Sequence, residues 1–212
     1  MMDKIEQPTE IKQCPVHGFF RGAECTCGNP GKFVLSSFKA EKLGKIISGA
    51  LRHFPEDLGL DIDEQGWIRL DDLIKVIEHK YPWARPYHVE AMFDTDDKGR
   101  YERKGNMVRA RYGHSVGIKL DFPDADYDLL YYGTSEEEAD RILDIGLKPV
   151  NQHYVHLSKS MEEAVKVACI RTDHPVIIEV DARKAQKNGI RILDAGPVCL
   201  AHMVPSDFIQ IG

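Results

Sequence analysis

The sequence predicts an α+β protein with two lobes, preceded by an N-terminal extension that a zinc ion holds together. Three observations lead to this prediction. Cysteines and a histidine cluster before residue 32, apolar residues recur at helical spacing from residue 36, and short apolar stretches alternate with helical ones after residue 128. We therefore expect three domains, over residues 1–32, 33–120 and 121–212.

The composition is that of a folded protein. The 212 residues include 42% hydrophobic and 29% charged ones, which argues against disorder, collagen-like repeats and coiled coil. No stretch approaches the roughly 20 apolar residues of a membrane span, and the polar start up to Gln13 differs from a signal peptide. We expect a cytoplasmic monomer without a membrane partner.

The extension carries the pattern C-x2-H-x7-C-x-C, formed by Cys14, His17, Cys25 and Cys27. Too few apolar residues surround this pattern to bury a core, so we expect a tetrahedral zinc ion bound by three thiolates and one imidazole. A disulfide is the alternative, but the odd number of five cysteines in a cytoplasmic chain argues against it. Because four protein ligands leave no position for water, the zinc is expected to be structural.

The first lobe shows three helical stretches followed by a β-hairpin. The apolar spacing of Leu43, Ile47 and Leu51 predicts a helix over about 36–52, which ends before Pro55. The other predicted elements are a short strand at 66–68, a helix capped by Asp71, a helix that begins at Pro86 and a hairpin over 101–108. This order is the layout of a winged-helix module.

Charge is unevenly distributed along the chain. The net charge of −6 argues against a globally cationic nucleic-acid binder. Residues 98–111, however, hold six positive residues against Glu102, and residues 121–144 hold nine acidic residues against Arg141. The electric field of charges that change sign along the chain can orient a polyanion. The alternative is a solvated hairpin beside an acidic linker, which has the same composition.

The second lobe is predicted to be a β-rich α+β domain of about 90 residues, long enough for a core of its own. Strands are expected at 129–134, 154–158, 176–180, 190–193, 199–202 and 208–211, and helices at 137–145 and 161–169. Cys169 and Cys199 have apolar neighbours and are expected in the core.

Several cationic residues are candidates for binding phosphate. Arg52 and His53 end the first predicted helix, where they either face a cleft or complement the helix dipole. Arg109 and Arg111 are expected on one strand face, where two planar guanidinium forks match phosphate oxygens. The alternative is an exposed, solubilising hairpin. His114 follows a glycine that allows close approach to a ligand.

Two strand ends are candidates for ligand contact. Tyr132-Gly133-Thr134 ends a strand at a turn, where the glycine permits a ligand to approach the backbone. His156 and Ser158 are expected on one face of their strand. Packing within the fold is the alternative for both, and Arg171 taken alone is typical of a surface residue. The sequence contains no G-x-G-x-x-G, P-loop or H-E-x-x-H motif.

A series of short motifs, each weak alone, runs through the two lobes. The motifs are ISGALRHFPE at 47–56, GW at 66–67, DDKGRY at 96–101, RARYGHS at 109–115, YYGT at 131–134, VHLS at 155–158, Arg171 ahead of PV at 175–176, and VDA at 180–182. With these motifs in this order, residues 33–212 resemble the RNA 2′-phosphotransferase (KptA/Tpt1) family. The extension resembles one found in archaeal members of the family.

The resemblance implies a winged-helix RNA-binding lobe and a second lobe with an ADP-ribosyltransferase-like, NAD-binding fold. It implies a reaction in which an internal 2′-phosphate of RNA, typically tRNA, attacks C1″ of NAD and expels nicotinamide. The ribose 2″-hydroxyl then attacks phosphorus. This step releases ADP-ribose 1″,2″-cyclic phosphate and leaves a 2′-hydroxyl on the RNA.

The resemblance also assigns roles to residues. The catalytic residues it implies are Arg52, His53, Arg109 and Arg171. The NAD-binding residues it implies are Tyr132, Gly133, Thr134, His156, Leu157 and Ser158, and the residues it implies for binding RNA phosphate are Arg111 and His114. Three arginines would offset the repulsion between the 2′-phosphate and the NAD pyrophosphate. His53 either transfers a proton or binds phosphate as its cation.

Two positions depart from the family pattern. Tyr132 stands where the family usually has histidine, which affects NAD affinity and the first step more than the reaction class. Arg111-Tyr112 replaces a usual Asn-Gln and adds charge beside the phosphate site. The alternatives to a phosphotransferase are an ADP-ribosyltransferase acting on terminal phosphates or on protein, and an inactive zinc-containing RNA-binding protein.

Overall fold

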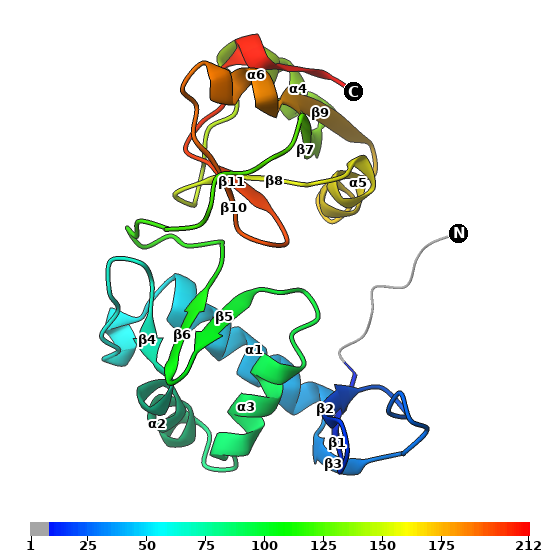
Figure 1. The fold of residues 1–212 in the computed structure, drawn as a ribbon, viewed down its shortest axis with the longest axis vertical. Coiled ribbons are helices and arrows are strands. Elements are labelled where there is room, and N and C mark those ends of the chain that lie inside the picture. The colour runs from blue at the N-terminus through cyan, green and yellow to red at the C-terminus, as the bar shows by residue number, and fades with distance from the viewer. Residues whose placement is uncertain (1–8) are drawn as a thin grey trace. The chain divides into compact units, whose positions relative to one another are not determined.

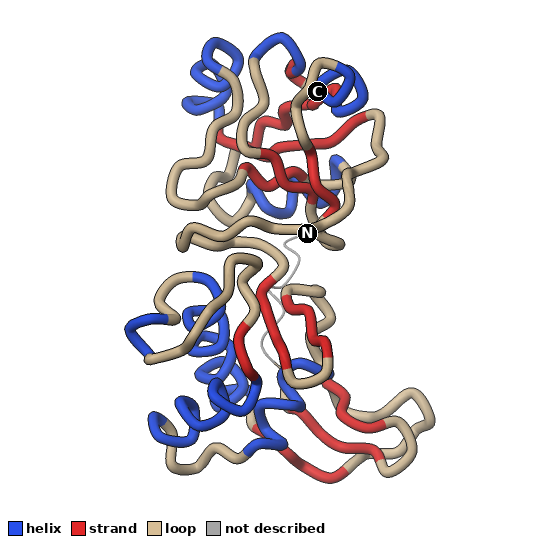
Figure 2. Tube along the Cα trace, turned by 60° about the vertical axis from the view of Figure 1, so that its left-hand side comes forward, coloured by secondary structure: helices blue, strands red, loops and turns tan. Residues whose placement is uncertain are grey.

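The computed structural model describes residues 9–212, which divide into two compact units after residue 110 (Figure 1). We call residues 9–110 unit 1 and residues 111–212 unit 2. Both units combine helices with small three-stranded sheets (Figure 2), which confirms the predicted mixture of α and β elements. The three domains predicted from the sequence stay a prediction. No helix within residues 9–212 is long and apolar enough to cross a membrane.

Unit 1 begins with a three-stranded antiparallel sheet that the sequence analysis did not predict. β1 (Ile11–Cys14) lies between β2 (Gly18–Arg21) and β3 (Lys32–Leu35). We call residues 11–35 the head. Ile11 and Leu35 are buried and belong to the core cluster that also contains the helices of unit 1, so the head shares that core.

Three helices, α1 (Ser37–Arg52), α2 (Leu70–Lys80) and α3 (Pro86–Asp94), surround this core. The prediction of a helix over 36–52 is confirmed, because Ser36 caps α1 by accepting a hydrogen bond from the backbone of Lys39. A 3-10 turn, η1 (Glu56–Leu58), follows α1. The predicted Asp71 cap is wrong: α2 begins at Leu70, so Asp71 lies in the first turn, where it still complements the helix dipole.

The predicted hairpin is present. β5 (Tyr101–Lys104) pairs with β6 (Met107–Ala110), whose other edge pairs with β4 (Ile68–Arg69). Gly105 forms the turn with a φ of +58°, a conformation that favours glycine. Because β6 ends at Ala110, Arg111 lies outside the strand. The prediction that Arg109 and Arg111 share a strand face is therefore wrong.

Unit 2 contains two antiparallel three-stranded sheets. The order of the first is β12-β9-β7, made of β7 (Leu129–Ser135), β9 (Pro175–Asp181) and β12 (Ile209–Ile211). The order of the second is β10-β11-β8, made of β8 (Val155–Leu157), β10 (Ile192–Asp194) and β11 (Cys199–Ala201). Backbone hydrogen bonds between Tyr131 and Ser158 join β7 to the residue after β8.

The helices of unit 2 are α4 (Glu136–Ile145), α5 (Met161–Ala168) and α6 (Ala182–Lys187), with a 3-10 turn at η2 (Ser206–Phe208). The first two confirm the predicted helices to within one residue. The sequence analysis missed α6, a short helix that buries only two alanines. Cys199 is buried as predicted, but the prediction for Cys169 is wrong, because this residue caps the end of α5 and is exposed.

Candidate functional site

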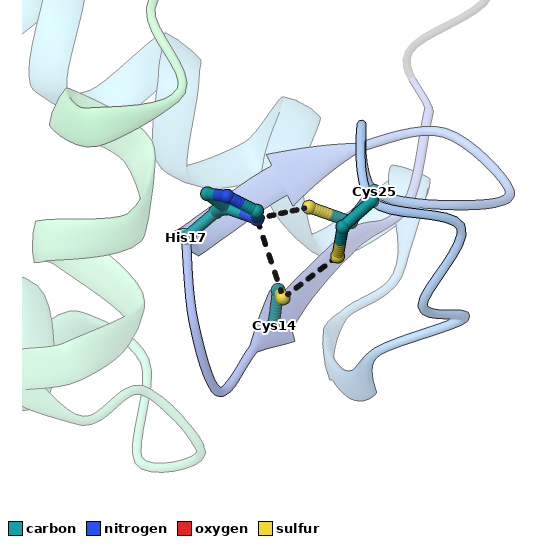
Figure 3. Close-up of side chains that lie close together, drawn as sticks. Cys14, His17 and Cys25 are labelled. Atoms are coloured by element: carbon teal, nitrogen blue, oxygen red, sulfur yellow. Dashed lines mark hydrogen bonds between the residues drawn. The ribbon is translucent and has the colours of Figure 1, made fainter.

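The four predicted metal ligands of the head lie together. Cys14 ends β1, His17 lies in the turn before β2, and the other two cysteines belong to the loop before β3 (Figure 3). The ligand atoms of Cys14, His17, Cys25 and Cys27 all lie within 4.8 Å of one another. The structure thus assembles three sulfurs and one imidazole from a segment of 14 residues.

The distances fit a tetrahedral zinc ion better than a disulfide. The His17 Nδ1 atom is 3.8 Å from Cys14 Sγ and 3.4 Å from Cys25 Sγ, and the Cys14 and Cys27 sulfurs are 3.7 Å apart. With Zn–S bonds of about 2.3 Å and Zn–N bonds of about 2.0 Å, tetrahedral ligands lie about 3.5–3.8 Å apart. A disulfide requires about 2.05 Å between sulfurs.

Backbone N–H groups of the head favour thiolates. The pKa of Cys25 is lowered to about 6, chiefly because the backbone N–H of Cys27 donates to its sulfur. Backbone N–H groups of His17 and Val16 likewise lower the pKa of Cys14. Since the thiolate is the form that binds metal, these bonds prepare the cluster for a cation.

Arg52 and His53 lie at the end of α1, as predicted. Arg52 is the last helical residue, with its guanidinium 5.9 Å from the ring of Tyr101. His53 is the C-cap and is exposed. Partial burial, followed by the positive charge of Arg52, lowers the pKa of His53, so its neutral form dominates at neutral pH. A neutral imidazole can accept a proton.

Arg109 is held inside unit 1. Its side chain is 2% exposed, and both Nε and Nη2 lie 2.9 Å from the carboxylate of Glu102. Nη1 donates to the carbonyl oxygen of Gln65, and the guanidinium lies 4.5 Å from the ring of Trp67. These contacts fix the orientation of Arg109 and connect the hairpin to the Gly66-Trp67 motif.

Acidic residues compensate much of the charge that the sequence places on the hairpin. Besides the pair of Arg109 with Glu102, Arg100 pairs with Asp96, Arg103 with Glu90 and Lys104 with Glu102. Four of the six cations counted between residues 98 and 111 therefore have an acidic partner within 4.0 Å. The hairpin is less positive than its sequence indicates.

A pocket in unit 2 brings Arg171 together with the predicted NAD-binding turn. It lies where β7, the start of α4 and the end of α5 meet, and its lining residues are Gly133, Thr134, Ser135, Glu138, Ala168 and Arg171. Tyr132 directly precedes the lining residue Gly133. Burial raises the pKa of Tyr132, and the positive charge of Arg171 opposes this shift.

Glu138 is a pocket residue that the sequence analysis missed. Its Oε2 atom accepts a hydrogen bond of 2.7 Å from the hydroxyl of Thr134. The sequence contains a signal for this residue: Glu138 follows Thr134 by four positions and lies in the first turn of a helix that begins directly after the strand. The pocket thus presents the hydroxyl of Thr134, the carboxylate of Glu138 and the guanidinium of Arg171.

Gly133 has a packing role that the sequence analysis did not anticipate. A Cβ atom at this position would collide with the carbonyl oxygen of Ala164 and lie 2.8 Å from Cβ of Ala168. Both alanines belong to α5, so the glycine lets this helix approach β7 closely. The predicted contact of Gly133 with a ligand stays a prediction.

The remaining predicted residues lie elsewhere in unit 2. His156 accepts a hydrogen bond from the backbone of Gly113 through Nε2, at 3.2 Å. Leu157 is fully buried in the core, and Ser158 bonds to Tyr131, the neighbour of Tyr132. The two residues predicted to bind RNA phosphate differ in exposure: His114 is 2% exposed, while Arg111 is half-buried with its guanidinium 5.8 Å from the ring of Phe122.

Comparisons with known proteins identify close relatives. A family model described as RNA 2′-phosphotransferase, Tpt1 / KptA family, matches residues 39–196. A protein named Probable RNA 2′-phosphotransferase 1 from Archaeoglobus fulgidus is 53% identical over 203 residues, which cover 95% of this chain and 94% of the relative. Proteins named Probable RNA 2′-phosphotransferase from Methanosarcina barkeri and Pyrococcus furiosus are 46% and 39% identical, over 95% and 80% of this chain and 98% and 93% of their own lengths.

Proposed function

Because this chain belongs to the Tpt1/KptA family of RNA 2′-phosphotransferases, we propose that it removes an internal 2′-phosphate from RNA with NAD as co-substrate. The observation that carries the proposal is the match of the family over residues 39–196, which include parts of both units. The proposed substrate is tRNA with a 2′-phosphate. NAD supplies the ribose carbon that accepts the phosphate and nicotinamide as the leaving group.

The pocket of unit 2 is the proposed NAD site. The phenol of Tyr132, the hydroxyl of Thr134 and the carboxylate of Glu138 offer hydrogen bonds to ribose hydroxyls. Residues 156–158 extend this site, because Ser158 is hydrogen-bonded to β7 beside Tyr132. Arg171 supplies a permanent positive charge for a phosphate group at the same pocket.

The cations of unit 1 are proposed to act on the transferred phosphate. Arg52 binds its oxygens, and Arg109 contributes a guanidinium whose orientation Glu102 and Trp67 fix. The lowered pKa of His53 favours the proton-accepting role over binding as a cation, so we assign this residue to the proton of the attacking 2″-hydroxyl. Arg111 and His114 are proposed to contact neighbouring RNA phosphates.

The proposal extends to the architecture and the metal. We assign the helices and hairpin of unit 1 to a winged-helix RNA-binding lobe and unit 2 to an ADP-ribosyltransferase-like fold. The three sulfurs and one imidazole of the head are proposed to hold structural zinc, and their spacing supports this assignment. Such a zinc ion supplies folding energy to the head and takes no part in the chemical steps.

The test is a product analysis with a matched RNA pair. The purified protein is incubated with NAD and an oligonucleotide that carries one internal 2′-phosphate, or with the same oligonucleotide bearing a 2′-hydroxyl. We expect nicotinamide release only with the phosphorylated RNA, together with ADP-ribose 1″,2″-cyclic phosphate and dephosphorylated RNA. A stable ADP-ribosylated RNA would indicate an ADP-ribosyltransferase instead, and no nicotinamide release would refute both activities.

A further inference from the structure

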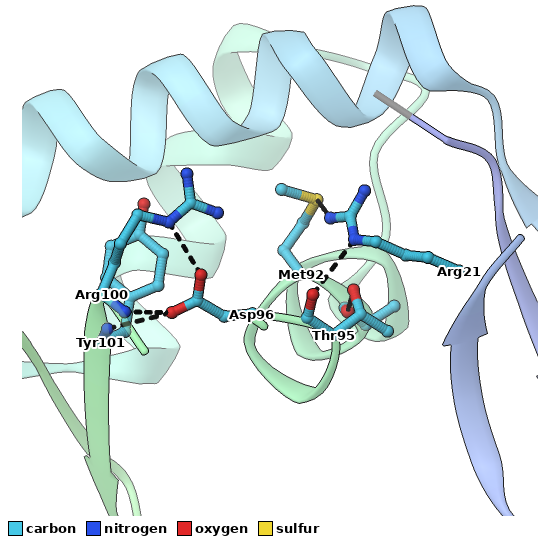
Figure 4. Close-up of polar contacts among 7 residues, drawn as sticks. Arg21, Met92, Thr95, Asp96, Arg100 and Tyr101 are labelled. Atoms are coloured by element: carbon cyan, nitrogen blue, oxygen red, sulfur yellow. Dashed lines mark hydrogen bonds and ion pairs between the residues drawn. The ribbon is translucent and has the colours of Figure 1, made fainter. Parts of the chain in front are cut away.

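Arg21, the last residue of β2, ties the head to the end of α3. Its Nε atom donates to the carbonyl oxygen of Thr95 at 3.1 Å, and Nη2 lies 3.8 Å from the sulfur of Met92 (Figure 4). The Nη1 atom of Arg21 donates a third hydrogen bond, of 3.3 Å, to the carbonyl oxygen of Thr9. Burial lowers the pKa of Arg21, and the carboxylate of Asp97 opposes this shift. The guanidinium is thus embedded between the head and the residue that caps α3.

Asp96, the next residue after Thr95, fixes the turn between α3 and β5. Its side chain is 4% exposed. One carboxylate oxygen accepts hydrogen bonds from the backbone N–H groups of Arg100, at 2.5 Å, and Tyr101, at 3.2 Å. The other oxygen accepts a hydrogen bond of 2.7 Å from Nε of Arg100 (Figure 4). A single buried carboxylate therefore determines where β5 begins and how Tyr101 enters the hairpin.

Tyr101 in turn contacts the end of α1. Its hydroxyl is buried. Its ring lies 5.9 Å from the guanidinium of Arg52 and 5.5 Å from that of Arg100. Contact with an aromatic face restricts the orientation of a guanidinium.

We propose that Arg21 and Asp96 are positioning residues for Arg52, and that the head acts on the reaction by fixing the turn between α3 and β5. The contacts run without interruption from Arg21 through Thr95 and Asp96 to Tyr101 and Arg52. This inference rests on the proposed role of Arg52 in binding the 2′-phosphate. A displacement of about 1 Å in such a group can cost up to about 100-fold in rate, so a network that holds the group in place matters to catalysis.

The first test is a double-mutant cycle on turnover of 2′-phosphorylated RNA. Asp96→Asn keeps the size of the side chain but replaces one acceptor oxygen with a donor. We expect it to lower kcat/KM for RNA about tenfold in the wild-type background and less than about twofold in the Arg52→Lys background. Arg21→Gln should follow the same pattern, and Arg21→Lys should recover only part of the loss because an ammonium lacks the fork.

The control for this cycle is Asp94→Asn. Asp94, the last residue of α3, lies two positions before Asp96 in the sequence but is exposed. Its substitution removes the same charge, and we expect kcat/KM to stay within about twofold of the wild type. Equal losses from Asp96→Asn in both backgrounds, or an equal loss from Asp94→Asn, would overturn the proposal, because the effect would then not pass through Arg52.

The second test does not require turnover. The Nε atom of Arg52 is buried, and loss of its signal in Arg52→Lys assigns the Nε–H resonance in nitrogen-15 NMR spectra of the full chain. We expect Asp96→Asn and Arg21→Lys each to raise the exchange rate of this proton with water at least about fivefold, with no change in Asp94→Asn. An unchanged rate in both variants would refute the positioning role. If the wild type fails to turn over the RNA, the proposed function fails, whereas this measurement still decides the positioning role.

Discussion

The positive charge of Arg171 acts on the phenol of Tyr132 beside the pocket of unit 2, where it opposes the rise that burial causes in the pKa of this phenol. The two residues belong to β7 and to the segment after α5, the helix that packs on the same strand. The phenol is neutral at neutral pH, so its oxygen can accept a hydrogen bond from the guanidinium. In this chain a tyrosine therefore lies where it can restrain the arginine that is proposed to bind phosphate.

Replacing Tyr132 tests this restraint. We expect Tyr132→Phe to lower kcat/KM for NAD about tenfold, because loss of one hydrogen bond to a charged group costs about 1.5–3 kcal/mol. Tyr132→His should retain more activity than Tyr132→Phe, since imidazole nitrogen can also accept a bond. Initial rates with NAD varied at saturating RNA provide the measurement. Wild-type rates in Tyr132→Phe would show that the bond is dispensable.

Arg171 is expected to be essential for removal of the 2′-phosphate. Arg171→Ala should lower the rate by at least about 100-fold, because it removes a preorganised positive charge from the phosphate. Since Arg171 is exposed, the melting temperature should change little. Arg141→Ala, which removes another exposed arginine of unit 2, is the matched control and should remain active. Equal activity of the two variants would remove Arg171 from the site.

The zinc ligands are expected to control the stability of the head and not the identity of the product. The wild type should contain one zinc ion per chain. Cys25→Ser should lose most of it and melt several degrees earlier, since structural zinc contributes folding energy directly. Cys169→Ser changes an exposed cysteine outside the cluster and serves as the control. Metal analysis that finds equal zinc in both variants would contradict the ligand assignment.

The pH dependence of the reaction reports the state of His53. Because the pKa of His53 is lowered from 6.5, its proton-accepting form persists to a more acidic pH than in an ordinary histidine. We expect kcat/KM to fall as the pH decreases, with a midpoint below pH 6.5. In His53→Ala this decrease at acidic pH should be absent. A profile of rate against pH provides the measurement. Activity that instead rises on protonation would support the cationic role of His53.

Gly133 provides a test of packing between β7 and α5. The methyl group of Gly133→Ala would press against the carbonyl of Ala164, so we expect the free energy of unfolding to fall by about 1–3 kcal/mol. In Gly117→Ala the new Cβ meets nothing closer than 4.0 Å, and this variant should be as stable as the wild type. Chemical denaturation of the two variants distinguishes these outcomes. Equal free energies of unfolding would show that α5 can move away from β7 at little cost.

Local patterns in the sequence predicted the elements whose signals are strong. The apolar spacing of α1 and the proline that begins α3 each located a helix, and the glycine turn at 105 located the hairpin. The four ligands of the head were predicted from side-chain chemistry alone. The sheet that carries them was missed, because its four-residue strands bury few side chains of their own.

The tertiary contacts of the site were beyond sequence patterns. Nothing in the motif around Arg109 indicates that Glu102 and Trp67 hold its guanidinium, since these partners depend on strand pairing and on the loop before β4. The packing reason for Gly133 likewise depends on where α5 lies. The resemblance to a family located candidate residues, whereas the neighbours that each of them contacts depend on the three-dimensional fold.

The fate of the RNA phosphate tests the central claim most directly. An RNA whose single internal 2′-phosphate carries a phosphorus label is incubated with the protein and NAD, and the products are separated. We predict that the label moves completely into ADP-ribose 1″,2″-cyclic phosphate, and that none appears when NAD is omitted. Label released as inorganic phosphate, or released without NAD, would contradict transfer to NAD-derived ribose.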